Sequence, residues 1–393
     1  MPYQPGSCEE LLRKLEGFNR YDEDQIDRYN HKYSFVIFSL LGLSVLVCEY
    51  VSDPISCWSP FEFPDSWVNY TRAICWISNT YHVPMTSPDW EYSSEREITY
   101  YQWVPLVLIL QALLFGLPWL YWNNSNESFG ISIHKMVKKC RDLEYSDTQL
   151  RTRTSQMLAA DIDKAVRYST SISLWSDRLQ KATVKFARYG LFWGRSCGNR
   201  LTANYLHTKV LYILNIILQI HLMSRFLSVE YWLFGWRALN SVKSTGSHQE
   251  LARFPRVAMC NFDIRAIGDK IHTYTVQCAL PVNMFNEKIF IFAWFWLVAM
   301  GIFNVLSTLW WLVNTRQFRQ NHFIKERLHD IGIIKDQRDD YKVSTFSRKY
   351  LQQDGCFILQ MIDSNTNDVI ILEIIEALWD RFYEEQPSVI EVL

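Results

Sequence analysis

The residues of this sequence that could do chemistry together are its cysteines. Of nine Cys, four lie in two polar segments far apart in the chain, Cys57 and Cys75 in the first and Cys260 and Cys278 in the second. Neither a CxxC motif nor a His/Cys cluster of zinc spacing occurs, so we expect no structural metal and no cofactor. Pairs of Cys in polar segments are typical of disulfides in an oxidising compartment. Four Cys allow three connectivities, and their spacing does not select one.

Other kinds of chemistry find little support in the sequence. It contains no GxSxG, HExxH or phosphate-binding Gly loop, so we do not expect an enzyme. Its 40 Lys and Arg nearly balance 41 Asp and Glu, which does not favour nucleic acid as a partner. A secondary transporter is also disfavoured, because there is no internal repeat and no charged pair in the middle of an apolar run.

Four long apolar stretches must position the cysteines. They cover about 33–50, 103–122, 206–229 and 289–313, and a helix needs roughly 20 residues to cross a bilayer. For the third stretch, which is more polar, a buried helix of a soluble protein is the alternative. The 16 Trp and 21 Tyr suit the membrane–water boundary. We therefore predict an all-α membrane protein with four transmembrane helices.

Basic residues at the ends of the stretches predict their orientation. Lys and Arg lie before the first and third stretches and after the second and fourth, as cytoplasmic flanks do. Segments 51–102 and 230–288 are then extracellular loops, and they hold the four paired Cys. Segments 1–32, 123–205 and 314–393 are then cytoplasmic, as an N-terminal region, a loop and a C-terminal region. Such a protein spans the plasma membrane and contacts its lipids.

Several motifs, spread in order along the chain, resemble the innexin family. They are DPISCWSP at 53–60, YYQWVP at 100–105, LQALLFGLPW at 110–119, FPRVAMCNFDIR at 254–265, NEKIFIFAWFWL at 286–297 and DGCFILQMI at 354–362. The resemblance implies a large-pore channel subunit that joins other innexins in a homomeric or heteromeric ring, expected to be an octamer. Two rings in apposed cells then dock into a gap junction that passes ions and small solutes. The resemblance also implies the pairs Cys57–Cys278 and Cys75–Cys260.

An amphipathic helix is predicted before the first stretch. Ser7-Cys-Glu-Glu10 fits a capping box, and the apolar residues that follow recur on one helical face. The pattern leaves open whether this helix lies on the membrane, in a cytoplasmic dome or at the pore mouth, and the family resemblance favours the pore. The candidate pore residues are Glu9, Arg13, Lys14 and Phe35.

Three further features each allow two interpretations. Pro105 and Pro118 lie near the two ends of the second stretch, where they either form a hinge or simply bend the helix. Polar residues in the third stretch either bond between helices or line the pore; they are Asn215, Gln219 and His221. Helices predicted near 147–175 and at 368–382 either pack together in a cytoplasmic dome or bind partners separately.

One motif complicates docking. Asn69-Tyr70-Thr71 is an N-glycosylation sequon inside the first predicted extracellular loop. A glycan at Asn69 could block contact between rings and leave an undocked hemichannel that releases small solutes. A four-span adhesion or scaffold protein without a pore is the alternative from another functional class. Docking remains the leading hypothesis.

Overall fold

The structure is a computed structural model, and it describes residues 22–51, 53–61, 63–78, 80–81, 97–98, 100–127, 132–143, 147–171, 198–228, 230–245, 254–265, 271–334 and 340–385. The chain divides into two compact units. Unit 1 combines the described parts of Met1–Lys32, Leu117–Ile213 and Phe303–Leu393, and unit 2 combines those of Tyr33–Gly116 and Leu214–Ile302. Each unit is therefore built from segments far apart in the sequence.

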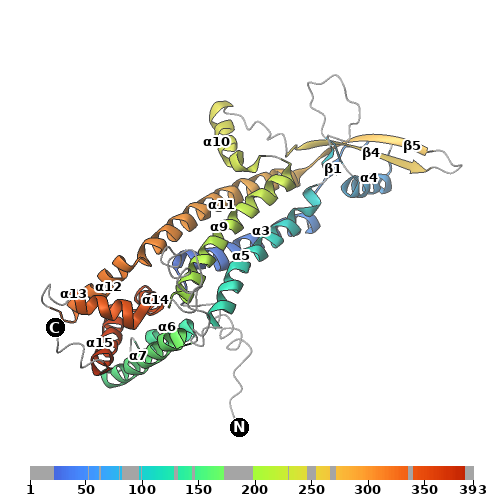
Figure 1. Ribbon diagram of the computed structural model, residues 1–393. Coiled ribbons are helices and arrows are strands. Elements are labelled where there is room, and N and C mark those ends of the chain that lie inside the picture. Colours follow the sequence, from blue (N-terminus) through green and yellow to red (C-terminus); the bar gives the residue numbers. More distant parts are fainter. Residues whose placement is uncertain are drawn as a thin grey trace, which may run out of the picture. The chain divides into compact units, whose positions relative to one another are not determined.

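Within the described residues, four helical segments are long and apolar enough to cross a membrane (Figure 1). They are Gln25–Val51, Tyr101–Asn126, Arg200–Leu227 and Pro281–Asn314. The first consists of α2 (Gln25–Arg28), the π-helix η1 (Tyr29–Ser34) and α3 (Phe35–Val51). The others are η3 (Tyr101–Trp103) with α5 (Val104–Glu127), α9 (Arg200–Leu227) and α11 (Pro281–Asn314). The predicted class, a mainly helical protein with four membrane-spanning helices, is confirmed.

The helix ends differ from the predicted limits for local reasons. Helix α9 ends at Leu227, before the predicted limit of 229, because Ser228 adopts a left-handed conformation with φ 51°. Helix α11 begins at Pro281, where proline needs no backbone donor. Pro105 lies in the first turn of α5 for the same reason, whereas α5 continues through Pro118. The apolar runs mark only the middle of longer helices.

A small sheet joins the non-spanning parts of unit 2, and the sequence analysis did not anticipate it. Five strands lie in the order β1-β5-β4-β2-β3, with β4 and β5 paired antiparallel along their whole length. The strands are β1 (Ser56–Cys57), β2 (Thr80–Tyr81), β3 (Glu97–Ile98), β4 (Val257–Arg265) and β5 (Ile271–Ala279). The same unit contains helix α4 (Asp65–Ile77), η4 (Tyr231–Leu233) and helix α10 (Phe234–Thr245).

The hydrophobic core of unit 2 continues from the helices into the sheet. Phe38 and Phe115 pack together between α3 and α5, with ring centroids 5.3 Å apart. Phe254, just before β4, and Phe290 of α11 pack against each other in the same cluster. The sheet therefore has no separate core of its own, and its base is fixed by the helices.

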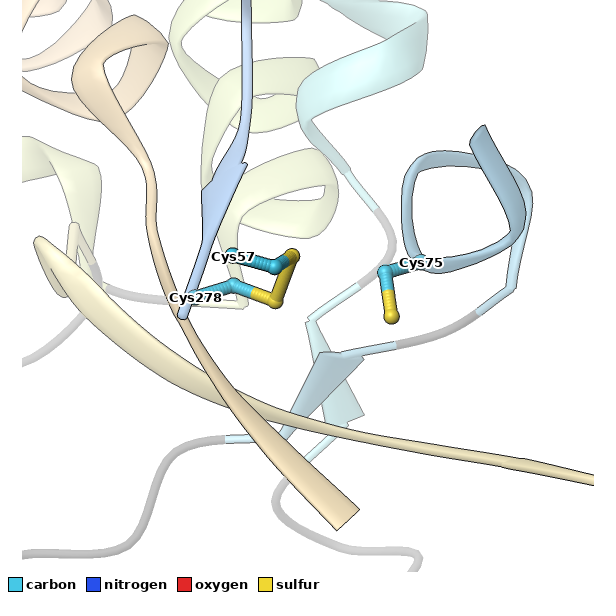
Figure 2. Close-up of side chains that lie close together, drawn as sticks. All are labelled: Cys57, Cys75 and Cys278. Atoms are coloured by element: carbon cyan, nitrogen blue, oxygen red, sulfur yellow. A yellow bond between two sulfur atoms is a disulfide. The ribbon is translucent and has the colours of Figure 1, made fainter. Parts of the chain in front are cut away.

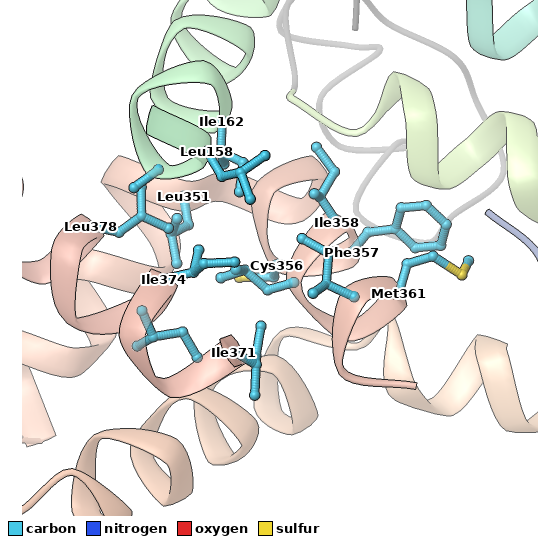
Figure 3. Close-up of a cluster of buried hydrophobic side chains, with 14 of the residues drawn as sticks. Leu158, Ile162, Leu351, Cys356, Phe357, Ile358, Met361, Ile371, Ile374 and Leu378 are labelled. Atoms are coloured by element: carbon cyan, nitrogen blue, oxygen red, sulfur yellow. The ribbon is translucent and has the colours of Figure 1, made fainter. Parts of the chain in front are cut away.

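Unit 1 is a helical bundle around a second core. It contains α6 (Ile133–Asp142), α7 (Thr148–Ser171), α12 (Gln317–Asp330), α13 (Asp340–Thr345), η6 (Phe346–Leu351), α14 (Gln352–Asp363) and α15 (Asp368–Glu385). Figure 3 shows Leu158 and Ile162 of α7 facing Ile374 and Leu378 of α15, with Cys356 of α14 between them. The middle segment and the C-terminal helix therefore pack together, the first of the two alternatives considered above.

Candidate functional site

Two disulfides stabilise the sheet of unit 2, one between two of its strands and one between the sheet and α4. Cys57 and Cys278 are register partners on β1 and β5 and are bonded to each other. Cys75 on α4 is bonded to Cys260 on β4. These are the pairs that the family resemblance implies. The sulfur of Cys75 lies within 4.8 Å of the sulfurs of Cys57 and Cys278 (Figure 2), but all three are disulfide-bonded and offer no thiolate to a metal ion.

The β4–β5 hairpin is held at its base and exposed at its far end. Both Cys260 and Cys278 are fully buried near the base. At the start of β5, by contrast, Ile271, His272 and Thr273 are all exposed. The hairpin therefore presents an ordered, protruding edge.

Residues of the YYQWVP motif contact both segments that carry the disulfides. The Tyr100 hydroxyl donates to the side-chain oxygen of Asn283 over 3.2 Å, and the Asn283 amide donates to the carbonyl of Pro255 over 3.0 Å. Tyr101 is fully buried against Trp76 of α4, with ring centroids 4.9 Å apart, and Gln102 donates to the backbone carbonyl of Trp76. The motif thus links the starts of α5 and α11 to both disulfide-bonded segments.

The sequon residue Asn69 lies on helix α4. Its side chain is exposed, whereas Thr71, the third residue of the sequon, is buried. The Cys75–Cys260 disulfide holds the same helix. Glycosylated sequons lie in surface loops, so the folded environment of Asn69 is unusual for a glycan acceptor.

A buried polar cluster in unit 1 ties the start of the first span to the third and fourth. The Lys209 ammonium lies 2.8 Å from an Asp27 oxygen and 3.1 Å from an Asp24 oxygen, and it donates to Ser307 over 2.8 Å. The Tyr205 hydroxyl donates to Asp27 over 2.8 Å. Lys209 is fully buried. A buried charge of this kind needs such partners, because losing one leaves an uncompensated ion.

The charge state of Asp24 follows from this cluster. Burial by itself raises the pKa of Asp24, but Lys209 and hydrogen bonds from Ser307 and Trp311 outweigh it and lower the pKa below its ordinary value. A carboxyl with a lowered folded pKa stabilises the fold above its unfolded pKa. That contribution is lost only as the pH falls through the lowered value, so Asp24 stays ionised at neutral pH.

The DGCFILQMI motif holds the N-terminus of α9. Asp354 accepts hydrogen bonds from the backbone N–H and the hydroxyl of Thr202, each 3.0 Å long, and its own N–H donates to Gly198 over 2.9 Å. Burial raises the pKa of Asp354, while hydrogen bonds from the first residues of α9 oppose that shift. A Cβ on Gly355 would lie 3.2 Å from side-chain atoms of Leu351 and Val166, so the helix packs closely there.

The predicted pore residues are only partly visible. Glu9, Arg13 and Lys14 lie outside the described residues, together with the predicted N-terminal helix. Phe35 is the first residue of α3, and its side chain is exposed. The polar residues of the third span differ in burial: Asn215 and Gln219 are buried, whereas His221 is exposed.

Sequence reasoning missed the partners of Lys209 and of Asp354. Lys209 counted only as a basic flank of the third span, and Asp354 only as part of a motif. The acidic run at 22–27 beside a span was the available signal for the buried cluster. No spacing rule could have named the pairs, because Asp24 and Lys209 lie 185 residues apart.

The fold and the site define a class: a four-span membrane protein in which the segment between the first and second spans is joined by disulfides to the segment between the third and fourth. Comparison with known proteins is consistent with that class. The Innexin family matches residues 23–382. Innexin unc-9 of Caenorhabditis elegans is 32% identical over 371 residues, covering 93% of this chain and 94% of its own length. Innexin-10 of the same organism is 33% identical, covering 96% of this chain and 68% of its own length.

The chain therefore belongs to the innexin family, whose members are subunits of gap-junction channels. A less similar relative also matches over nearly the whole chain: Innexin eat-5 of Caenorhabditis elegans is 27% identical, covering 94% of this chain and 90% of its own length. The resemblance of the sequence motifs and the predicted junctional channel function are confirmed at this level. Innexins form gap-junction channels with other innexin subunits, and they are membrane proteins.

Proposed function

We propose that this chain forms a ring with copies of itself or with other innexins, and that two rings in apposed cells dock through the β4–β5 hairpin. Family resemblance leads us to expect eight subunits in each ring. The observation that carries the docking proposal is the contrast along the hairpin. Its base is covalently fixed at Cys260 and Cys278, whereas its far end at Ile271–Thr273 is exposed and unoccupied by other described residues.

The energetics of docking favour such a hairpin. Ordering a flexible loop at the moment of contact costs roughly 1–2 kcal/mol for each residue. Strands β4 and β5 are already paired over nine residues each, and two disulfides fix their base. An ordered hairpin avoids most of that cost, so more of the contact energy remains for holding two rings together.

Both termini are proposed to lie in the cytoplasm, with the disulfide-linked sheet outside. The basic flanks of the spans support this orientation, and disulfides persist in an oxidising compartment. An epitope at the C-terminus should become accessible to antibody only after the membrane is permeabilised. Staining of intact cells would contradict the orientation.

The N-terminal segment is proposed to line the pore mouth. The buried cluster of Asp24, Asp27 and Lys209 supports this role, because it fixes the point from which residues 1–21 extend. Glu9 then belongs to the polar face of a helix in the ion path. Replacing Glu9 with Lys should shift junctional permeability toward anions, measured from reversal potentials in paired cells with unequal salt. An unchanged ratio would place Glu9 away from the pore.

Dye transfer tests the proposed function as a whole. Cells expressing the chain are paired, and a small charged dye is injected into one of them. Passage into the neighbouring cell supports a docked junction. Loss of dye to the medium alone supports an undocked hemichannel, and retention of the dye supports a scaffold without a pore. The variant Ile271→Asp, at the exposed end of the hairpin, should abolish transfer between cells while leaving uptake by single cells unchanged.

The undocked hemichannel remains the second candidate because Asn69 is exposed on α4. The burial of Thr71 argues against efficient glycosylation of the folded helix. We expect that glycosidase digestion leaves the electrophoretic mobility of the chain unchanged, and that Asn69→Gln has the same mobility. A faster band after digestion that is absent from Asn69→Gln would support the hemichannel instead.

A further inference from the structure

The chain turns sharply where the third span ends. Helix α9 ends at Leu227, and Ser228 takes the left-handed conformation with φ 51°. Within seven residues a new helix has begun, with η4 at Tyr231–Leu233 leading into α10 at Phe234–Thr245 (Figure 1). The Ser224 hydroxyl accepts a hydrogen bond of 3.2 Å from the N–H of Tyr231, which holds the new helix close to the end of α9.

One face of this helix is clamped to α11. Tyr231 is fully buried, and its hydroxyl donates to the carbonyl of Phe290 over 2.7 Å. Phe234 stacks on Tyr231 with ring centroids 5.2 Å apart. A Cβ on Gly235 would lie only 2.1 Å from the ring of Trp294, so only glycine lets the two helices approach this closely. These contacts fix the rotation of α10 about its axis.

A neighbouring face of the same helix is apolar and exposed. Trp232, Trp236 and Leu239 follow the spacing i, i+4 and i+7 and share one side. Each is about half exposed, as is Leu233. Arg237, the residue after Trp236, is exposed and forms an ion pair with Glu230 just before the helix. The helix thus has a tryptophan-rich apolar stripe next to a paired, water-facing charge.

We propose that α10 lies flat on the outer surface of the membrane, with Trp232, Trp236 and Leu239 inserted at the boundary between lipid headgroups and acyl chains. Trp favours this boundary, and amphipathic helices with Trp and Leu on their apolar face bind along it. Continuity with a spanning helix identifies lipid as the occupant. Phe295 is exposed on α11 and packs edge-on against Trp294, with ring centroids 4.9 Å apart. Trp294 is also the residue that Gly235 of α10 contacts. The apolar stripe therefore extends the exposed apolar surface of a transmembrane helix.

The placement of α10 on the outer side rests on the proposed orientation, and the experiment separates the two. Full-length Trp236→Cys is expressed in cells, and a thiol-specific nitroxide that does not cross membranes is added outside. The matched control is Arg237→Cys, because Arg237 is the next residue and is also exposed, with its side chain paired to Glu230. Membranes are taken into polymer-bounded lipid discs without detergent, and the signal of the parent chain is subtracted. Collision rates of the nitroxide are measured with oxygen, which concentrates in lipid, and with a water-soluble nickel chelate.

The proposal predicts several-fold more oxygen than nickel collisions at position 236 and the reverse at position 237. Equal nickel access at both positions would place the stripe in water and overturn the inference, while leaving the proposed function intact. Low access of both reagents at position 236 would overturn it in favour of a contact with a neighbouring subunit. Labelling of neither variant at the cell surface would contradict the orientation itself. Leu239→Cys, on the same face, repeats the measurement if Trp236→Cys does not reach the surface.

Discussion

Asp354 accepts two hydrogen bonds of 3.0 Å from Thr202, one from its backbone N–H and one from its hydroxyl. Asp354 begins the DGCFILQMI motif in the C-terminal part of the chain, and Thr202 belongs to the first turn of α9. The first N–H groups of a helix have no partner within the helix, and an acceptor placed there stabilises it. A motif far along the chain therefore caps a membrane-spanning helix.

Removing this cap should destabilise unit 1. Asp354→Ala leaves the buried backbone N–H of Thr202 without its acceptor, and we expect a loss of about 1–3 kcal/mol. Asp354→Asn keeps an acceptor and should lose less. Thermal melting of the solubilised protein, followed by size-exclusion fluorescence, measures both. Asp380→Ala, at an exposed position on α15, is the control and should melt like the parent chain. Equal melting of Asp354→Ala and the control would mean that the cap adds no stability.

The buried cluster predicts a larger loss at Lys209. Lys209→Met keeps the length of the side chain but leaves Asp24 and Asp27 together without their cation, and breaking a buried pair costs about 3–5 kcal/mol. We expect the variant to be retained inside the cell or to aggregate on solubilisation. Lys138→Met, at an exposed position of α6, is the matched control and should behave as the parent chain does. Normal surface delivery of Lys209→Met would show that the cluster is dispensable for folding.

The disulfides should be required for coupling between cells. Cys57 and Cys278 close a loop of 221 residues, for which the chain-entropy estimate gives roughly 5 kcal/mol of stabilisation. Cys57→Ser also leaves a free thiol beside the Cys75–Cys260 bond. We expect Cys57→Ser and Cys278→Ser to abolish junctional conductance in paired cells, whereas Cys356→Ser should retain it. Retained conductance in Cys57→Ser would argue strongly against a role of this bond in docking.

The two buried thiols in the described part of unit 1, Cys140 and Cys356, should be nearly inert. Burial raises the pKa of Cys140 and of Cys356 to about 12, above the ordinary thiol value. At pH 8 such a group is only about 0.01% thiolate, the form that reacts with maleimides. We expect no labelling of either peptide in the native protein and full labelling after denaturation, as read by mass spectrometry. Rapid native labelling of Cys356 would show that α14 opens to solvent.

The sequence predicted the spans well because hydrocarbon demands a long apolar helix whatever its neighbours are. The run from Ile289 to Val313 is an example, since it lies inside α11. The sheet was not predictable in the same way. Strands β1, β2 and β3 have two residues each, too few for a periodic pattern. Tertiary contacts hold them in place: β1 pairs with β5 and is bonded to it through Cys57–Cys278, β2 pairs with β4, and β3 pairs with β2.

Apart from the two disulfides, which the family resemblance implies, contacts between residues far apart in sequence were also beyond prediction. The sequon at Asn69 was recognised, but its position on a helix with Thr71 buried depends on α4 packing at Cys75. The amphipathic helix α10 was not predicted, because its apolar residues surround a glycine whose purpose is visible only beside Trp294. In each case the missing information is a tertiary contact rather than a local preference.

The Cys57–Cys278 bond has a mechanical consequence. Cys57 follows the end of α3 by six residues, and Cys278 precedes the start of α11 by three. A short covalent path therefore joins the first and fourth spans, and it meets the hairpin at its base. If two rings dock through the hairpin as proposed, tension on it is shared between two membrane anchors when the cells are pulled apart, and the strands between these anchors do not have to separate to carry it.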